Sequence, residues 1–387
     1  MNGLAAHYRR FRVAERLLLT GHSHQAWPDV AEEGLLEAFA DAASQVDEKW
    51  TAAFAKADEL RAGVRLLLAD PAAEIAFGTS THELVIRLLS ALDLAARPRL
   101  VTTDGEFHTL RRQLRRLAEA GIELVRVPAE PVDTLAARLA AEADDRTAAV
   151  LVSRVLFETA RIVPGLDELA LACARRRVEL VVDAYHAIGV TELPVPALGL
   201  DSAWVLGGGY KYLQWGEGNC FLRLPPHALE LRPVVTGWYA EFGTLAEDGR
   251  ADRVRYAAGA DRFAGATYDP TSHYRAARVQ RFFTEQGLTP AVLREISLRQ
   301  NELLARLFDD LDLPDELVTR DRSAPRSAFG GFLALRCRDA GGLQRALAER
   351  GVATDSRGPY LRFGPAPYLS DAQLEAAIAA LAEVAVT

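Results

Sequence analysis

The sequence predicts an α/β fold in which a mainly parallel sheet is covered by helices on both faces and is followed by a smaller α+β domain. Short apolar runs alternate with longer stretches of helical period between residues 74 and 206. The runs are apolar on both faces, which is typical of parallel strands buried on both sides. After about residue 255, long helices are followed by short strands and interleaved helices. The chain of 387 residues is long enough for about two domains.

Six short apolar segments with loop residues at their ends predict the strands of the large domain. They cover residues 74–77, 99–102, 123–127, 148–152, 180–182 and 202–206. Helical period predicts helices between them at residues 82–91, 109–120, 131–141 and 166–176. Ligands bind beyond the carboxyl ends of the strands in sheets of this kind.

The segment after residue 255 reads as a separate, smaller domain. Its helices are expected at residues 272–286, 290–310, 341–350 and 370–384, and its strands near residues 329–336 and 359–363. We therefore predict a large domain at residues 26–255 and a small domain at residues 256–387. Residues 1–25 are expected to pack back onto the small domain.

Composition and charge exclude several function classes. The chain is 49% hydrophobic and 25% charged, as in soluble globular proteins, and its net charge of −8 argues against a nucleic-acid or anionic-membrane surface. It has no uninterrupted apolar stretch long enough to span a membrane, and its first residues lack the apolar core of a secretory signal. Cys173, Cys220 and Cys337 are scattered, so we expect neither a metal site nor a disulfide framework. A reducing cytoplasm fits this cysteine usage.

Residues suited to chemistry follow five of the predicted strands. If the strands are parallel, their carboxyl ends meet at one edge of the sheet, and these side chains share one pocket. They are Ser80 and Thr81, Phe107, Ser153, Asp183 and Lys211.

Lys211 is the most informative of them. It follows Gly207, Gly208 and Gly209 and lies among aromatic and apolar residues, where partial loss of water favours the neutral amine. A neutral lysine can form a Schiff base with a carbonyl cofactor. Asp183, at the end of a buried strand, is costly to bury unless it meets a positive group. Pyridoxal phosphate (PLP) needs both a lysine for its aldehyde and an acid for its ring nitrogen, so the pair predicts this cofactor.

The other pocket residues allow two interpretations each. Ser80 and Thr81 can hold a phosphate at a helix N-terminus, but Ser80 followed by Glu83 is also a capping box. Phe107 could stack on a flat ring or belong to the core, and His186 could contact the cofactor or be a core histidine. The Tyr210 hydroxyl could reach a phosphate. Arg362, in a short apolar strand, could bind an α-carboxylate or form an ion pair within its domain.

Motifs along most of the chain resemble those of fold-type I PLP-dependent enzymes of the class V aminotransferase group, and within them those of kynureninases. The matching segments are residues 21–23, 104–107, 183–187, 210–213, 237–238, 351–357 and 361–368. The last block is specific to kynureninase-like chains, whereas the acid and the Tyr-Lys pair occur in many relatives. The resemblance implies a seven-stranded, mainly parallel sheet and a homodimer with its active sites at the subunit interface.

The resemblance also implies a role for each matched position. Lys211, Asp183 and His186 would be catalytic. Ser23, His24 and Arg362 would lie on the substrate side, with Arg362 binding its carboxylate. Trp238 and Thr267 would reach the site of the neighbouring subunit. The residues assigned to PLP are Ser80, Thr81, Phe107, Thr109, Asp183, His186, Tyr210, Lys211, Trp238 and Thr267.

Kynureninases hydrolyse L-kynurenine or its 3-hydroxy form at the Cβ–Cγ bond, which makes that reaction the first expectation for this chain. Thr267 stands where they usually carry asparagine, and Leu110 where they tend to carry aspartate. An aminotransferase or another PLP lyase that acts on a different amino acid therefore stays open. A desulfurase is less favoured, because residues 353–360 contain no cysteine. A binding protein without turnover is disfavoured by the presence of both Asp183 and Lys211.

Overall fold

The central feature of the fold is a seven-stranded sheet in the order β2-β8-β7-β6-β5-β3-β4. The computed structural model describes residues 3–244 and 253–385. Strands β3, β4, β5, β6 and β7 pair in parallel, and only β8 runs antiparallel to its neighbours β7 and β2. The predicted mainly parallel sheet is therefore confirmed. Its strands are β2 Glu74–Gly78, β3 Arg99–Thr103, β4 Glu123–Val127, β5 Thr147–Ser153, β6 Glu179–Asp183, β7 Ala203–Gly208 and β8 Cys220–Leu224.

Strand β8 was absent from the strands expected from the sequence. It is short and carries Arg223, whose charge makes Cys220–Leu224 look unlike a buried strand. In the structure the Arg223 guanidinium is buried against Asp70, with Nη2 2.7 Å from Oδ2, and Nη1 donates to the carbonyl of Ala203. The ion pair allows an arginine in a strand that is paired on both sides, because a buried charge is tolerated when it is paired and hydrogen-bonded.

Helices cover both faces of the sheet, as successive residues of each strand show. In β5, Val150 and Val152 pack in one hydrophobic cluster with α5 and α6, whereas Ala149 and Leu151 pack in another with α3 and α4. This alternation is the period-two geometry of a strand with two buried faces. The helices are α3 Thr81–Ser90, α4 His108–Glu119, α5 Leu135–Glu142 and α6 Leu166–Arg175. The helix expected over residues 131–141 is a 3₁₀ turn at Val132–Thr134 followed by α5.

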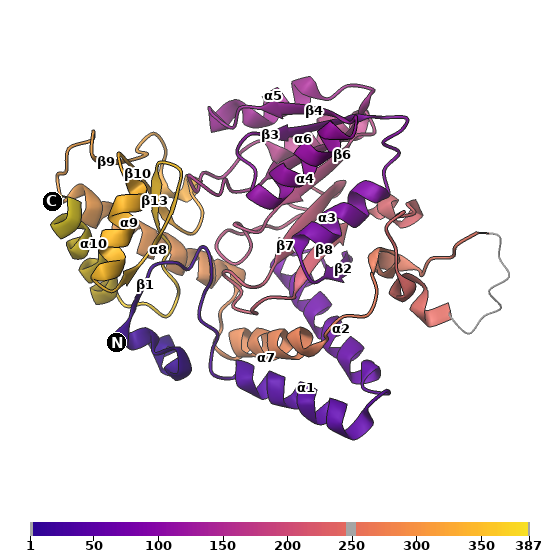
Figure 1. Ribbon diagram of the computed structural model, residues 1–387, viewed down its shortest axis with the longest axis horizontal. Coiled ribbons are helices and arrows are strands. Elements are labelled where there is room, and N and C mark those ends of the chain that lie inside the picture. The colour runs from indigo at the N-terminus through magenta and orange to yellow at the C-terminus, as the bar shows by residue number, and fades with distance from the viewer. Residues whose placement is uncertain (1–2, 245–252, 386–387) are drawn as a thin grey trace.

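Two further helices near the N-terminus, α1 Ala31–Gln45 and α2 Trp50–Leu67, were not among the expected elements. They pack against α7 Thr271–Glu285, and the three lie side by side at the bottom of Figure 1. The sequence places α7 in the small domain, whereas its helix partners here belong to the N-terminal part of the chain. The domain boundaries themselves stay a prediction.

The C-terminal part contains a four-stranded antiparallel sheet in the order β12-β13-β10-β9, next to α8, α9 and α10. The N-terminal segment reaches it, because β1 Leu17–Leu18 pairs in parallel with β11 Val352–Ala353. The strand expected from residue 329 begins later, at Leu333. The elements are α8 Pro290–Asp309, β9 Val318–Arg320, β10 Leu333–Cys337, α9 Ala340–Glu349, β12 Asp355–Arg357, β13 Tyr360–Phe363 and α10 Asp371–Ala385.

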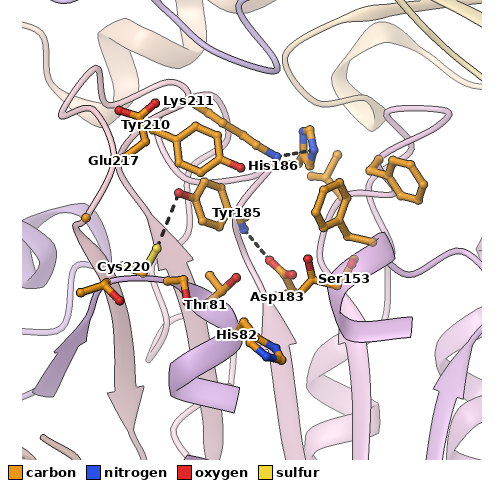
Figure 2. Close-up of a pocket in the computed structure, with 17 residues that line it drawn as sticks. Thr81, His82, Ser153, Asp183, Tyr185, His186, Tyr210, Lys211, Glu217 and Cys220 are labelled. Carbon is orange, nitrogen blue, oxygen red and sulfur yellow. Dashed lines mark hydrogen bonds between the residues drawn. The ribbon is translucent and has the colours of Figure 1, made fainter. Parts of the chain in front are cut away.

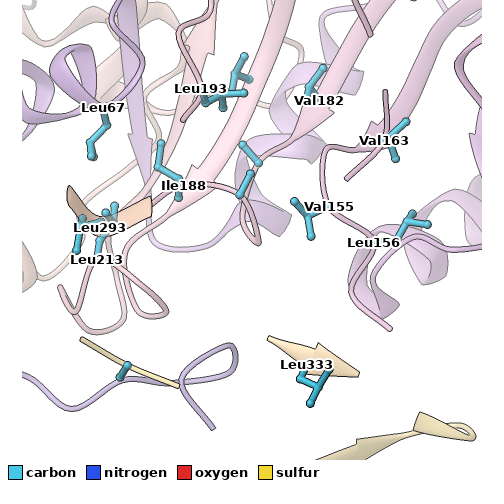
Figure 3. Close-up of a cluster of buried hydrophobic side chains, with 14 of the residues drawn as sticks. Leu67, Val155, Leu156, Val163, Val182, Ile188, Leu193, Leu213, Leu293 and Leu333 are labelled. Carbon is cyan, nitrogen blue, oxygen red and sulfur yellow. The ribbon is translucent and has the colours of Figure 1, made fainter. Parts of the chain in front are cut away.

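One hydrophobic cluster joins the large sheet to the C-terminal part. It contains Val182 of β6, Leu213 after β7, Leu293 of α8 and Leu333 of β10, all buried (Figure 3). Leu213 lies two residues beyond Lys211, so this cluster anchors the loop that carries the lysine. Within residues 3–244 and 253–385, no helix is long and apolar enough to cross a membrane.

Candidate active site

A cavity of about 280 Å³ opens at the edge of the sheet where the parallel strands end (Figure 2). It is lined from five strand ends and from the loop that leads into β8. The lining includes Thr79, Ser80, Thr81, His82, Phe107, Thr109, Ser153, Phe157, Asp183, Tyr185, His186, Tyr210, Lys211 and Cys220. The structure thus brings together the residues that the sequence placed at the five strand ends.

Lys211 is buried at this cavity, and its Nζ lies 2.7 Å from Nε2 of His186. Burial lowers the pKa of Lys211 from 10.5 to about 7, and the negative field of Asp183 only partly opposes this. Burial also lowers the pKa of His186 well below its ordinary value, so this imidazole stays neutral beside the amine. The pair therefore presents a lysine that is substantially uncharged near neutral pH, which is the nucleophilic form.

The three glycines before Lys211 allow the loop to pack closely. A Cβ on Gly209 would lie 2.5 Å from the Trp215 ring, and a Cβ on Gly207 would lie 2.5 Å from the Phe221 ring. The backbone N–H of Trp215 also donates to the Gly209 carbonyl at 2.9 Å, which closes the loop around Lys211. The local sequence thus fixes the lysine through steric fit with neighbouring aromatic rings.

Asp183 ends β6 and points to the cavity. Its Oδ1 accepts the backbone N–H of Tyr185 at 2.8 Å, and its carboxyl group is otherwise surrounded by protein with some surface open to the cavity. Burial raises the pKa of Asp183, because its one backbone hydrogen bond and the charge of Lys211 do not fully offset the loss of water around the carboxylate. In the described part of the chain the positive group that acts on it is Lys211, whose field offsets only part of the effect of burial. A positive group in the cavity would fill that need.

A second buried acid, Glu106, lies behind the cavity and was not singled out from the sequence. Its carboxylate accepts hydrogen bonds from Ser153 Oγ at 2.6 Å, Ser153 N–H at 3.1 Å and Thr103 Oγ1 at 2.7 Å. Burial raises the pKa of Glu106 to about 7 despite these donors. Glu106 thereby fixes Ser153, which pairs with Asp183 in the register of β5 and β6. The available signal was an acid directly after the Asp-Gly turn that follows β3.

The loop before α3 shows the capping geometry that was one of its two interpretations. Ser80 is the N-cap, and its side chain accepts from the backbone N–H of Glu83. The Glu83 carboxylate in turn accepts from Thr79 N–H at 2.9 Å and from Thr79 Oγ1 at 2.8 Å. The cap leaves Ser80 and Thr81 on the cavity wall at the positive end of the helix. Phosphate binding by these residues stays a prediction.

Aromatic side chains surround the Lys211 amine. Its Nζ lies 5.4 Å from the ring centre of Phe107, 4.8 Å from that of Tyr185 and 5.8 Å from that of Tyr210. His24, from the N-terminal segment, stacks on Tyr210 with ring centres 4.8 Å apart, and Ser23 Oγ lies 3.1 Å from His24 Nδ1. Ser23 and His24 are therefore brought next to the cavity, although neither lines it.

Arg362 lies behind the cavity wall, with its guanidinium occupied by protein groups. Nε and Nη2 donate to the two oxygens of Asp355 at 2.8 and 2.5 Å, and Nη1 donates to the carbonyl of Phe157. His22 Nε2 lies 2.8 Å from the same carboxylate. Burial alone would raise the pKa of Asp355, but the hydrogen bonds and charges of His22 and Arg362 hold it well below its usual range.

This arrangement is the domain-internal ion pair that the sequence left as an alternative for Arg362. Binding of a substrate carboxylate by Arg362 stays a prediction. It requires at least one of the hydrogen bonds between the Arg362 guanidinium and Asp355 to break.

Trp238 and Thr267 contact each other outside the lining of this cavity. Trp238 Nε1 donates to Thr267 Oγ1 at 3.1 Å, and Trp238 is 44% exposed. Neither residue lines the cavity that holds Lys211 in the same chain.

Comparisons with known proteins bear on the fold and on the C-terminal part of the chain. Residues 293–381 match the kynureninase C-terminal domain family. No curated protein matches the chain. The chain is similar to a mutant of C-DES with glycine covalently linked to its PLP cofactor, at a TM-score of 0.83 and 19% identity over 98% of each chain.

Two further solved structures have the same fold. The cystine C–S lyase C-DES with its product cysteine persulfide matches at a TM-score of 0.81 and 19% identity, over 96% of this chain and 98% of that one. A cysteine desulfurase from Thermococcus onnurineus NA1 matches at 0.78 and 18%, over 96% and 95%. The predicted fold class, that of fold-type I PLP-dependent enzymes, is confirmed. The kynureninase match spans less than half of the chain, so it leaves the particular activity to be proposed.

Proposed function

We propose that this chain is a PLP-dependent enzyme that acts on an amino acid. The observation that carries the proposal is the buried Lys211 amine, whose pKa is about 7, in a cavity that also holds the Asp183 carboxyl. A neutral amine and a buried acid are the two groups that this cofactor requires at its aldehyde and its ring nitrogen.

The residues present fit the cofactor. Lys211 would attach the aldehyde, Asp183 would pair with the ring nitrogen and Phe107 would stack on the ring. Ser80, Thr81, Thr109 and Tyr210 would hold the phosphate at the N-terminal end of α3. When bound, PLP supplies an electron sink that stabilises negative charge on the substrate α-carbon.

The protein side of the chemistry follows from the contacts of Lys211. Nζ is the group placed to take a proton from the substrate Cα and to return it, because it is buried at the cavity and close to neutral. His186 orients the amine through its Nε2 contact at 2.7 Å and adds no positive charge that would compete with the proton. The aromatic walls exclude water and lower the local dielectric constant.

We infer hydrolysis of a Cβ–Cγ bond in a kynurenine-like substrate as the first specific activity. The C-terminal match to kynureninase and the motifs at residues 351–368 support it. We also propose a cytoplasmic homodimer in which Trp238 and Thr267 reach the site of the neighbouring subunit. Their absence from the lining of the cavity in one chain and the exposure of Trp238 support this arrangement.

A C–S lyase acting on a cystine-like substrate is the second candidate. The likeness to C-DES over 98% of the chain favours it. A desulfurase reaction that depends on a loop thiol is less favoured, because residues 353–360, which run from the end of β11 through β12 to the start of β13, contain no cysteine. Transamination by a class V aminotransferase is the remaining alternative.

Product analysis separates these activities. The purified holoenzyme is incubated separately with kynurenine, 3-hydroxykynurenine, cystine and a donor amino acid plus keto acid, and products are identified by mass. We expect alanine and an anthranilate from the kynurenines. Persulfide and pyruvate from cystine would support the C–S lyase instead, and an exchanged amino group would support transamination. No product above a Lys211→Ala control in any reaction would contradict the proposed function.

The rate of cofactor attachment should depend on pH with a midpoint near 7. Burial disfavours the ammonium form, so the reactive neutral amine of Lys211 predominates above about pH 7 and is lost as pH falls below it. We therefore expect the rate at which apo-protein acquires the visible absorption band of bound PLP to rise through pH 7 and then level off. A rate that kept rising well beyond this pH would indicate a lysine with its ordinary pKa.

A further inference from the structure

Gly208, the last residue of β7, is next to the cavity and leaves room for one particular side chain. Its backbone does not have a positive φ, so its conformation alone does not require glycine. A Cβ at this position would lie 2.5 Å from Tyr185 Oη and 2.6 Å from two carbons of the Tyr185 ring. Contacts this short exclude any larger residue while Tyr185 keeps its place, so the two positions are sterically coupled.

The Tyr185 hydroxyl is directed toward the phosphate end of the proposed cofactor site. It lies 3.7 Å from Sγ of Cys220, at the start of β8 (Figure 2). The Cys220 thiol also interacts with the backbone N–H of Thr81, the first residue of α3. The hydroxyl also interacts with Tyr210, one of the residues proposed to hold the phosphate. Burial raises the pKa of Tyr185 well above 10, so the phenol keeps the proton that it would donate to the phosphate.

The rest of Tyr185 contacts the other two parts of the site. Its ring centre lies 4.8 Å from Lys211 Nζ, which is closer than the Phe107 ring at 5.4 Å. Its backbone N–H donates to Asp183 at 2.8 Å. One residue therefore contacts the acid and the amine and approaches the N-terminal end of α3, where the phosphate is proposed to bind.

We infer that Tyr185 is a cofactor-binding residue of this chain, whose ring forms a second aromatic wall beside Phe107 and whose hydroxyl donates to the cofactor phosphate. This inference rests on the proposed function, because it requires PLP in the cavity. Gly208 contributes to the site because its lack of a side chain leaves space for the Tyr185 ring.

The test compares two ligands, PLP and pyridoxal, which differ in the phosphate alone. Dissociation constants for the apo-protein are measured by absorbance titration. Tyr185→Phe should raise the dissociation constant of PLP by roughly tenfold to a hundredfold, the range for the loss of a hydrogen bond to a charged group. The dissociation constant of pyridoxal should stay unchanged. Tyr185→Ala should also weaken the binding of pyridoxal, by about two- to tenfold, because the aromatic ring beside the cofactor is lost. Tyr212→Phe is the matched control, since Tyr212 is a buried tyrosine next to Lys211 that does not line the cavity.

Gly208→Ala gives an independent route to the same answer. It should weaken PLP binding in the wild-type background and have little effect in the Tyr185→Ala background, because the added methyl group then meets an empty space. Thermal melting of each apo variant checks that it is folded.

The outcomes separate the two levels of the proposal. Wild-type protein that binds neither ligand would overturn the proposed function and this inference with it. Tight PLP binding by wild type and equally tight binding by Tyr185→Phe would overturn the assignment of the hydroxyl. Tighter PLP binding by Tyr185→Ala would show that the Tyr185 ring occupies the space of the cofactor, and it would overturn the assignment of the ring as a wall of the site.

Discussion

Replacing Lys211 with alanine is expected to lower product formation by about 10²–10⁴-fold or more, the largest effect of any single substitution in this protein. The variant loses both the amine that attaches the cofactor and the group placed to move the proton at the substrate Cα. The measurement is kcat with whichever amino acid the product analysis identifies. Borohydride reduction followed by peptide mapping should label position 211 in the wild type and no peptide in the variant.

Lys56 is the matched control for this experiment. It is another largely buried lysine, but it lies in α2, with its Nζ 2.7 Å from Glu37. Lys56→Ala should keep the borohydride label at position 211 and the wild-type kcat. Labelling of a different lysine, or full activity in Lys211→Ala, would contradict the role given to Lys211.

Replacing Asp183 with asparagine is expected to lower kcat by about 10²–10³-fold, as when one preorganised electrostatic partner is removed from a water-excluded site. The amide has nearly the same shape, so attachment of PLP at Lys211 should persist. It has no negative charge to hold a proton on the ring nitrogen, and the electron sink is weakened. Steady-state kinetics and the visible absorption band, measured on the same samples, separate the two effects.

Asp70→Asn serves as the comparison for Asp183→Asn. Asp70 is also a buried acid, but it pairs with Arg223 outside the cavity. Its replacement should lower the free energy of unfolding and leave kcat of the folded protein nearly unchanged. Equal losses of kcat in the two variants would mean that Asp183 acts through stability alone.

The fold was largely predictable because its signals are local. The apolar runs and helical periods between residues 74 and 206 correspond to β2 through β7 and to α3 through α6, with end shifts of one or two residues at most positions. Strand β8 was not predicted, because Arg223 interrupts its apolar pattern and its compensating partner, Asp70, lies 153 residues away in the sequence. A distant ion pair leaves no local trace.

The candidate site divides in the same way. Lys211, Asp183 and Phe107 could be proposed from their positions at strand ends, since parallel strands bring these ends together. Glu106 and Tyr185 were not singled out from the sequence, because the contacts that mark them are long-range. Glu106 accepts a hydrogen bond from Ser153, and Tyr185 fills the space beside Gly208.

Arg362 shows the same limit on the substrate side. The sequence left two interpretations of this residue, and only the structure shows Asp355 in contact with its guanidinium fork.

The sequence by itself determined the type of sheet, the order of most elements and the lysine and acid on which the proposed chemistry depends. Hydrophobic period and residue type along a short stretch of chain carry that information. Only the tertiary structure decided the lowered pKa of Lys211, the partner of Arg362 and the fit of Tyr185 against Gly208. These three properties depend on burial and on distances between segments that lie far apart in the chain. The free-energy cost of burying a charge, or of adding a methyl group, depends on the atoms that surround it in the folded protein.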